Sequence, residues 1–410
     1  MSFLRRPVVL MVLGFVVLAM GGLAFATRDT TKIDPAAATR CEFPPCRASA
    51  DPMPARGYEG AYVAADPATD FSLDLGAKLA ADEKGEGRET EASSPFRLGM
   101  RRLRRNKVSL AFGALFIVLV ASSLAAPLWS EHVAHKGPSA GKTTDQIRID
   151  GKLTDVVSVD SIPIGPTWSG EYFLGSDESG RDVMVRLLYG GRNSLLIGVF
   201  AALITTFFAV LVGLIAGYFR GWVDAVTRSL LDVMWSFPVI ILGVALGVAL
   251  ALGGLKLGPI SIESGSKLLP LLIIAFIYIP YMARPVRGQV LSLREKEFVE
   301  AARAQGAGPI RIMFSELLPN LASTIVVFFT LLVANAILLE SALSFLGAGV
   351  QPPETSWGTL IDSGVERIVT APHLTIVPGL MLVLTVLALN IFGDGVRDAF
   401  DPRAKVRMEH

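Results

Sequence analysis

The stretch EAARAQGAGPIRIMFSELLPN, residues 300–320, is polar, contains Arg and Glu, and lies between two long apolar runs. Charged side chains are rare inside the hydrocarbon layer of a bilayer. The neighbouring runs, residues 267–284 and 322–346, are apolar and long enough to cross such a layer. The sequence therefore predicts that residues 288–320 form a loop at a membrane surface.

The composition of the whole chain is that of a membrane protein. Of its 410 residues, 51% are hydrophobic and 18% are charged, whereas a soluble protein carries about 25% charged residues. The net charge of +1 gives no general attraction to nucleic acid. Six apolar spans follow residue 100, at 108–128, 194–219, 229–252, 267–284, 322–346 and 373–393. We therefore expect an all-α, polytopic membrane protein.

Basic residues indicate the orientation of these spans, because Lys and Arg mark cytoplasmic loops. Six of them precede the first span: Arg97, Arg101, Arg102, Arg104, Arg105 and Lys107. Counting crossings from there places 129–193, 253–266 and 347–372 outside, and 220–228, 285–321 and the tail from 394 inside. The tail has its own basic residues, among them Arg397 and Arg403, so we expect a cytoplasmic C-terminus.

The first 93 residues divide into an apolar segment, 1–27, and a polar linker, 28–93. The apolar run 7–26 ends in Ala24-Phe25-Ala26, as a secretory signal does before its cleavage site. We favour instead an extra N-terminal helix that runs from outside to inside, because it leaves residues 94–107 in the cytoplasm. An interfacial helix and an unused upstream start codon are the alternatives. The linker composition predicts weak structure.

Residues 94–128 are then a basic cytoplasmic segment followed by the first core span, and residues 129–193 are an external loop. This loop is too long for a simple connection. Apolar and polar residues alternate in it on both sides of Asp150-Gly151, which suits a type I′ turn. We expect a small external β-hairpin that packs on the helices or on a partner.

Within the loop 288–320, Leu291, Phe298 and Val299 can share one apolar face with Ala301 and Ala302. This spacing predicts a short amphipathic helix along the membrane surface. The two alanines are small enough to let a second protein approach the backbone.

The end of that helix also has a local signature. Gly306 can adopt the left-handed conformation that ends a helix and turns the chain. Pro309 suits the first turn of the next helix, and Pro319 is expected to mark the re-entry into the following span.

The order Glu300-Ala301-Ala302, then Gly306, then Leu318-Pro319 resembles the signature loop of the permease subunits of binding-protein-dependent ATP-driven importers. In that family the loop is a short helix that seats in a cleft of a separate ATPase subunit. The resemblance implies that these six residues form an ATPase-coupling loop. It also implies that this chain is not an enzyme, that it holds no cofactor or metal, and that ATP and Mg²⁺ bind in partner subunits. Glu316 departs from the general pattern, which has an apolar residue there, but it suits the peptide-importer branch.

Three further stretches, 174–195, 344–358 and 390–403, look like segments of dipeptide and oligopeptide permeases. The resemblance covers roughly 94–406, with the permease core at 194–406. It implies a type I ABC importer permease: a helical core of six spans, here with one extra N-terminal helix, in a bacterial inner membrane. The implied partners are a second homologous permease, two ATP-binding subunits, an extracytoplasmic substrate-binding protein and the bilayer, without nucleic acid.

The sequence gives little support to a channel, a secondary carrier or a nucleotide-binding protein. A self-sufficient channel or secondary carrier would need buried charged residues or a filter loop inside the spans, and the sequence indicates neither at mid-span. Gly137 to Thr143 is not a phosphate-binding loop, because three residues rather than four separate its glycines. A related permease for nickel or another non-peptide solute stays open, since selectivity in this family lies mostly with the binding protein.

Several residues have expected structural roles. Charged residues before the second span should form ion pairs and a cap on a helix in the outer interface, where Trp357 should act as an interface anchor. These residues are Asp177, Glu178, Arg181 and Asp182. The pairs Gly213–Gly217 and Gly243–Gly247 should allow close helix packing, and Pro238 and Pro280 should kink their helices.

Overall fold

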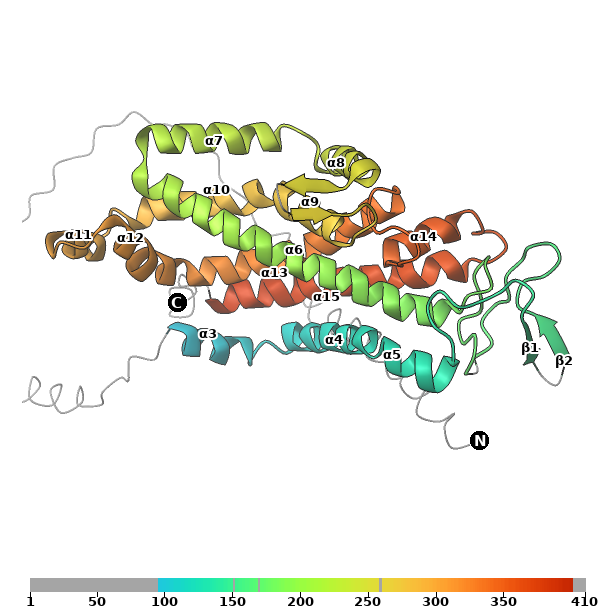
Figure 1. Ribbon diagram of the computed structural model, residues 1–410. Helices are drawn as coiled ribbons and strands as arrows, with labels where there is room; N and C mark the ends of the chain where they lie inside the picture. The colour runs from blue at the N-terminus through green and yellow to red at the C-terminus, as the bar shows by residue number, and fades with distance from the viewer. Residues whose placement is uncertain (1–94, 150–151, 169, 258–259, 401–410) are drawn as a thin grey trace, which may run out of the picture.

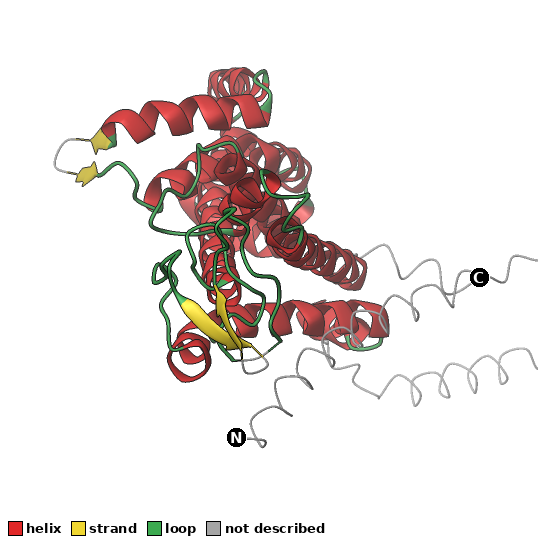
Figure 2. Cartoon of the chain, turned by 90° about the vertical axis from the view of Figure 1, so that its right-hand side faces the viewer, coloured by secondary structure: helices red, strands yellow, loops and turns green. Residues whose placement is uncertain are grey.

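A computed structural model of the chain describes residues 95–149, 152–168, 170–257 and 260–400. The expected N-terminal helix, 1–27, and linker, 28–93, lie outside these residues, as does the turn Asp150-Gly151. Long helices run side by side in an elongated bundle (Figure 1). Figure 2 views this bundle from one end, with one hairpin in front of the helices and a second projecting from the side.

The helices up to residue 253 are α3 Pro95–Leu103, α4 Lys107–Leu124, α5 Ala126–Trp129, the π-helix η2 Ser130–Ala134, α6 Val183–Phe219, α7 Gly221–Trp235 and α8 Val239–Gly253. Those that follow are α9 Leu268–Ile277, α10 Ile279–Leu293, α11 Glu297–Ala304, α12 Pro309–Arg311, the π-helix η3 Ile312–Leu317, α13 Leu318–Phe345, α14 Trp357–Val365 and α15 His373–Phe400.

Two short antiparallel hairpins complete the fold. The predicted one is confirmed: β1, Gln146–Ile149, pairs with β2, Lys152–Asp155, so that Gln146 faces Asp155. A second hairpin joins β3, Leu255–Leu257, to β4, Ile260–Ile262. This second hairpin was not predicted from the sequence, because strands of three residues are too short for an alternation of apolar and polar residues to be distinctive.

Among the described residues, five helices are long and apolar enough to cross a membrane, or up to six if a bent pair counts as one span. The expectation of an all-α polytopic protein is thus confirmed. The pair is α7 with α8, which meet at 84°, so the predicted span 229–252 is broken at Pro238, where the sequence predicted a kink. Pro238 explains the break, because it lacks an N–H and disfavours helical backbone at the preceding residue. The second span also begins earlier than predicted, at Val183.

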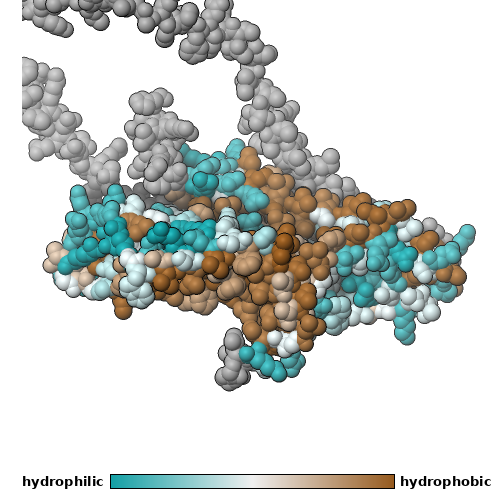
Figure 3. All heavy atoms as spheres, turned by 90° about the horizontal axis from the view of Figure 1, so that it is seen from above, coloured by the Kyte–Doolittle hydropathy of each residue, from teal (hydrophilic) through white to brown (hydrophobic). Residues whose placement is uncertain are grey.

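The two ends of the bundle carry different segments. Helices α3, α11 and α12 lie at one end, and the hairpin β1–β2 lies at the other (Figure 1). On the face shown in Figure 3, an apolar band separates polar regions at the two ends. This distribution is typical of a protein that exposes its middle to lipid and its ends to water.

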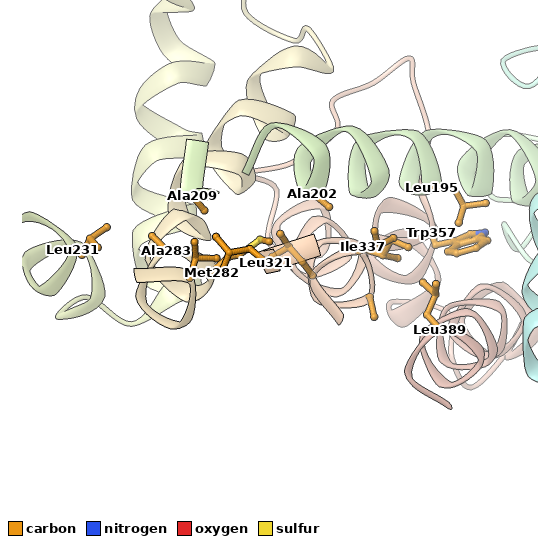
Figure 4. Packing of buried hydrophobic residues seen from close by; sticks show 14 of the residues in the cluster. Leu195, Ala202, Ala209, Leu231, Met282, Ala283, Leu321, Ile337, Trp357 and Leu389 are labelled. Carbon is orange, nitrogen blue, oxygen red and sulfur yellow. The ribbon is translucent and has the colours of Figure 1, made fainter. Parts of the chain in front are cut away.

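The core lies around the long helix α6, which packs against α10 and α13. Gly213 and Gly217 of α6 pack against Val286 and Val290 of α10, respectively. A Cβ atom added to either glycine would come within 2.7 Å of the valine that it faces. Buried side chains such as Leu195, Ile337 and Leu389 continue the contact along the bundle (Figure 4). Packing of small residues against branched ones therefore joins the long helices, as the spacing of the glycines predicted.

Trp357 belongs to this core and not to a membrane interface. Its side chain is fully buried, and its Nε1 donates a 3.2 Å hydrogen bond to the carbonyl oxygen of Leu187. Gly191 leaves room for the indole ring. The expectation of an interface anchor was wrong because a Trp beside an outer loop looks the same in sequence whether it faces lipid or the protein interior.

Candidate functional site

The candidate coupling loop begins where α10 ends at Leu293, and α11 then runs from Glu297 to Ala304. Glu297 and Glu300 lie in the first turn of α11 and Arg303 in its last turn, which suits the helix dipole. Val299 is fully buried in the main core. The amphipathic helix is confirmed, but its predicted start was wrong: Leu291 belongs to α10, because the chain stays helical to Leu293 before it turns.

The chain leaves α11 through a Schellman motif. The N–H of Gly306 donates to the carbonyl oxygen of Arg303 at 2.9 Å, and the N–H of Ala307 donates to that of Ala302 at 3.0 Å. Gly306 has a φ of +79°, the left-handed conformation that this motif requires and that side chains with a Cβ disfavour. The sequence prediction for the conformation of Gly306 is confirmed.

The return into the bundle begins earlier than predicted. Pro309 opens α12, and α12, η3 and α13 form one continuous apolar helix, Pro309–Phe345. Pro319 lies at the start of α13, where the sequence analysis expected it, and α12 and η3 extend the same helix back to Pro309. The first turn tolerates proline, and the π-helix η3 lies just before Pro319. Segments of π-helix are frequent at functional sites.

The six candidate residues divide between two places. Glu300, Ala301 and Gly306 are exposed on α11 and its turn, and Ala302 is half-buried there. Leu318, half-buried, and Pro319, exposed, lie at the start of α13. Helix α11 packs against η3, the segment that precedes Leu318.

Two large apolar side chains near α11 were missed by the sequence analysis. Ile310 is 70% exposed and Phe314 is 49% exposed. Both lie on the helix that follows Gly306, in a loop that is otherwise polar. Their only signal in the sequence is the apolar run around Arg311, residues 310–314, which the resemblance to the signature loop did not use.

Arginines at and before α11 contact the C-terminal end of α6. The guanidinium groups of Arg294 and Arg303 each lie 5.8 Å from the ring centre of Tyr218, and Arg294 also donates to the Tyr218 carbonyl oxygen. Arg220, the residue after α6, forms an ion pair with Glu295. These contacts join α11 and the turn before it to the C-terminal end of α6.

A second set of ion pairs holds α7 alongside α10. Asp224 is buried and receives two N–H groups of Arg287, one at 2.7 Å, and one of Arg228 at 2.9 Å. Farther along α7, Asp232 pairs with Arg284 at 2.8 Å. The pairs of Arg284 with Asp232 and of Arg287 with Asp224 were not predicted from the sequence, because each joins residues more than 50 positions apart along the chain.

At the other end of the bundle, charged residues hold the start of α6. Asp177 pairs with Arg181 at 2.8 Å and with buried Arg186, and Glu178 pairs with Arg367 at 2.8 Å. The carboxylate of Asp182 caps α6 by accepting from the backbone N–H groups of its first turn. The predicted ion pairs and cap are confirmed, but the capped helix is the long span itself rather than a separate helix in the interface.

The spans do contain a buried carboxyl group. Glu340 lies in the predicted span 322–346, on α13, and is fully buried. The sequence analysis expected no ionisable residue at mid-span, and Glu340 lies halfway between the middle and the end of this run. A signal was present: Ser344 follows Glu340 by four residues, a spacing that puts both on one helix face. No group of three His, Cys, Asp or Glu residues forms a metal site in the described part of the chain.

Comparisons with known proteins agree with this architecture. Residues 209–406 match the family "Binding-protein-dependent transport system inner membrane component", and residues 94–143 match the "N-terminal TM domain of oligopeptide transport permease C". The glutathione transport system permease protein GsiD of Pectobacterium atrosepticum is 34% identical over 318 residues, which cover 78% of this chain and 94% of GsiD. The dipeptide transport system permease protein DppC of Alkalihalophilus pseudofirmus is 36% identical over 314 residues, covering 77% and 92%.

Among solved structures, inward-facing conformations of the MetNI methionine ABC transporter are similar at 19% identity with a TM-score of 0.44, covering 53% of this chain and 97% of that one. The apolar helices and the sequence matches define a multi-pass membrane permease, and the matched relatives are permease components of transport systems. The chain belongs to the peptide- and glutathione-type permeases of binding-protein-dependent ABC importers.

Proposed function

We propose that this chain is one of two non-identical permeases that together line a pathway for dipeptides or oligopeptides across a bacterial inner membrane. Two ATP-binding subunits hydrolyse ATP on the cytoplasmic side, and one of them engages α11 and its turn. A substrate-binding protein delivers the peptide at the opposite side. The C-terminus is cytoplasmic in this arrangement.

The observation that carries the proposal is the construction of α11. It offers the exposed residues Glu300, Ala301 and Gly306 at one end of the bundle, and buried Val299 fixes it to the core. Through Arg294, Arg303 and the ion pair of Arg220 with Glu295 it is tied to α6. Force applied to α11 therefore reaches a helix that extends to the opposite end of the bundle (Figure 1).

The positions of charged segments support the proposed orientation. Helix α3, with Arg101 and Arg102 in its last turn, lies at the same end as α11 (Figure 1). The final residues of α15 pack there too, because Phe400 contacts Gly99 of α3. Three segments that the positive-inside rule assigns to the cytoplasm are thus gathered at one end.

Site-specific cross-linking tests which end meets the ATPase. A photoreactive residue at Ala301 of the assembled complex should form an adduct with an ATP-binding subunit. The same residue at Leu153 of β2, which is 65% exposed at the opposite end, should not. An intact complex that gives the ATPase adduct from Leu153, or no ATPase adduct from Ala301, would contradict the proposal. Mass spectrometry of cargo from the same complex tests the peptide assignment, which a metal ion or other non-peptide solute would overturn.

A further inference from the structure

Serine hydroxyl groups surround the buried carboxyl group of Glu340 where α6, α13 and α14 meet. Ser344 Oγ donates a 2.7 Å hydrogen bond to Glu340 Oε1, and Ser341 Oγ lies 3.4 Å from Oε2. Ser194 of α6 and Ser356, the N-cap of α14, lie beside the same carboxyl group. Among the described residues, the side chains that donate hydrogen bonds to Glu340 are those of serines.

Three of these hydroxyl groups also hold backbone N–H groups of the segment that follows α13. The bonds run from Val350 N to Ser344 Oγ at 3.0 Å, from Trp357 N to Ser194 Oγ at 3.2 Å, and from Thr359 N to Ser356 Oγ at 3.3 Å. A hydroxyl group has one hydrogen to donate. Because each oxygen accepts from the backbone, its hydrogen is available to the carboxyl group, and each serine bridges Glu340 to residues 350–359.

The segment approaches α13 too closely for ordinary side chains. A Cβ atom at Gly349 would overlap Ser344, and one at Gly358 would overlap the carbonyl oxygen of Ser341. The backbone of residues 349–358 is thus seated directly on the turn of α13 that carries Glu340.

A second layer of polar contacts fastens the same segment farther out. Asn193, the neighbour of Ser194, donates to Glu354 Oε2 at 3.1 Å and to the carbonyl oxygen of Thr355 at 2.7 Å. Lys267, just before α9, forms a 3.0 Å ion pair with Glu354. Both layers join residues 354–357 to α6, so the segment connects α6, α9 and α13.

We propose that Glu340 is a positioning residue that holds residues 347–359 against α6 and α13, acting through the hydroxyl groups of Ser194, Ser344 and Ser356. Loss of its carboxylate frees three backbone-bound hydroxyl groups at once and lets the segment move away from the bundle. If the proposed function is correct, this segment belongs to the surface that receives the substrate-binding protein, and Glu340 sets the shape of that surface. The fastening itself does not depend on transport.

The labelling rate of a buried thiol measures how firmly residues 347–359 are held against α6 and α13. Thr355 is 2% exposed, and its hydroxyl group has no hydrogen-bond partner in the described residues, so Thr355→Cys is a mild change. With Cys41 and Cys46 replaced by Ser, a water-soluble maleimide should label this thiol slowly in the detergent-solubilised full chain. Adding Glu340→Gln should speed labelling about tenfold, because an amide N–H₂ would face hydroxyl hydrogens in place of an acceptor.

Two serines on the same helix face give a matched control. Ser344→Ala removes a hydroxyl group that bridges the carboxyl group to Val350, whereas Ser341→Ala removes one with only the 3.4 Å contact to Glu340. Labelling should rise strongly in the first and little in the second, and a thiol at exposed Ser161 should react equally in all backgrounds.

Unchanged labelling of a membrane-inserted Glu340→Gln variant would overturn the proposal. If that variant does not insert, the two serine variants decide: equal labelling in both would overturn it, and the expected difference would support it. Because the assay uses neither ATPase nor binding protein, a negative result leaves the proposed transport function to its own test.

Discussion

Replacing Gly306 with Val is expected to lower ATP-driven uptake by about tenfold or more while the protein stays in the membrane. The cause is backbone conformation rather than crowding, since no atom lies within 4 Å of a Cβ built at this position. A β-branched residue at a φ of +79° is strained by about 1–3 kcal/mol. The Schellman motif would open, and α11 would lose its fixed angle to the helix that starts at Pro309.

Two other substitutions separate strain from simple loss of glycine. Gly306→Asn should retain most uptake, because Asn tolerates the left-handed conformation. Gly308→Val is the matched control: Gly308 is also exposed and uncrowded, but its φ of −73° suits any residue. Uptake and membrane content should be measured together for all three variants. Equal uptake by Gly306→Val and the wild type would refute the view that the angle of α11 transmits force.

The second large effect is expected at the ion pairs between α7 and α10. Asp224→Ala leaves Arg287 and Arg228 without their shared carboxylate, and Asp224 is buried. Removing one partner of such a pair should lower the free energy of unfolding by about 3 kcal/mol. The change should appear as a lower midpoint of thermal unfolding in detergent.

Asp232→Ala on the same helix is the control. Its pair with Arg284 is largely exposed, with side chains 58% and 38% accessible, and exposed pairs contribute less than about 1 kcal/mol. Asp224 also lies in the first turn of α7, where a carboxylate contributes up to about 1 kcal/mol through the helix dipole, so a difference larger than that reports the buried ion pair. Equal shifts in the two variants would show that Asp224 does not hold α7 to α10.

Local sequence signals were sufficient for some parts of this fold. The left-handed turn at Gly306 needs glycine, and a hairpin around Asp150-Gly151 follows from alternation over a few residues. The apolar spans were equally visible, because their length alone indicates a bilayer. Each of these features depends on residues close together in the chain.

Other parts depend on residues that only the folded chain brings together. The carboxylate of Asp224 meets Arg287 across 63 positions of sequence, and Glu340 gathers serines from α6, α13 and α14. Pro238 predicted a kink, but a single proline does not determine the 84° angle between α7 and α8. The sequence could therefore predict the candidate coupling loop, but not the contacts that connect it to the bundle.

Reconstitution in vesicles tests whether these spans move solute uphill only when a separate ATPase drives α11. The chain alone should accumulate no peptide, with or without ATP. The complete complex should accumulate it when ATP is present, and a complex carrying Gly306→Val should not. Accumulation by the isolated chain would contradict the account.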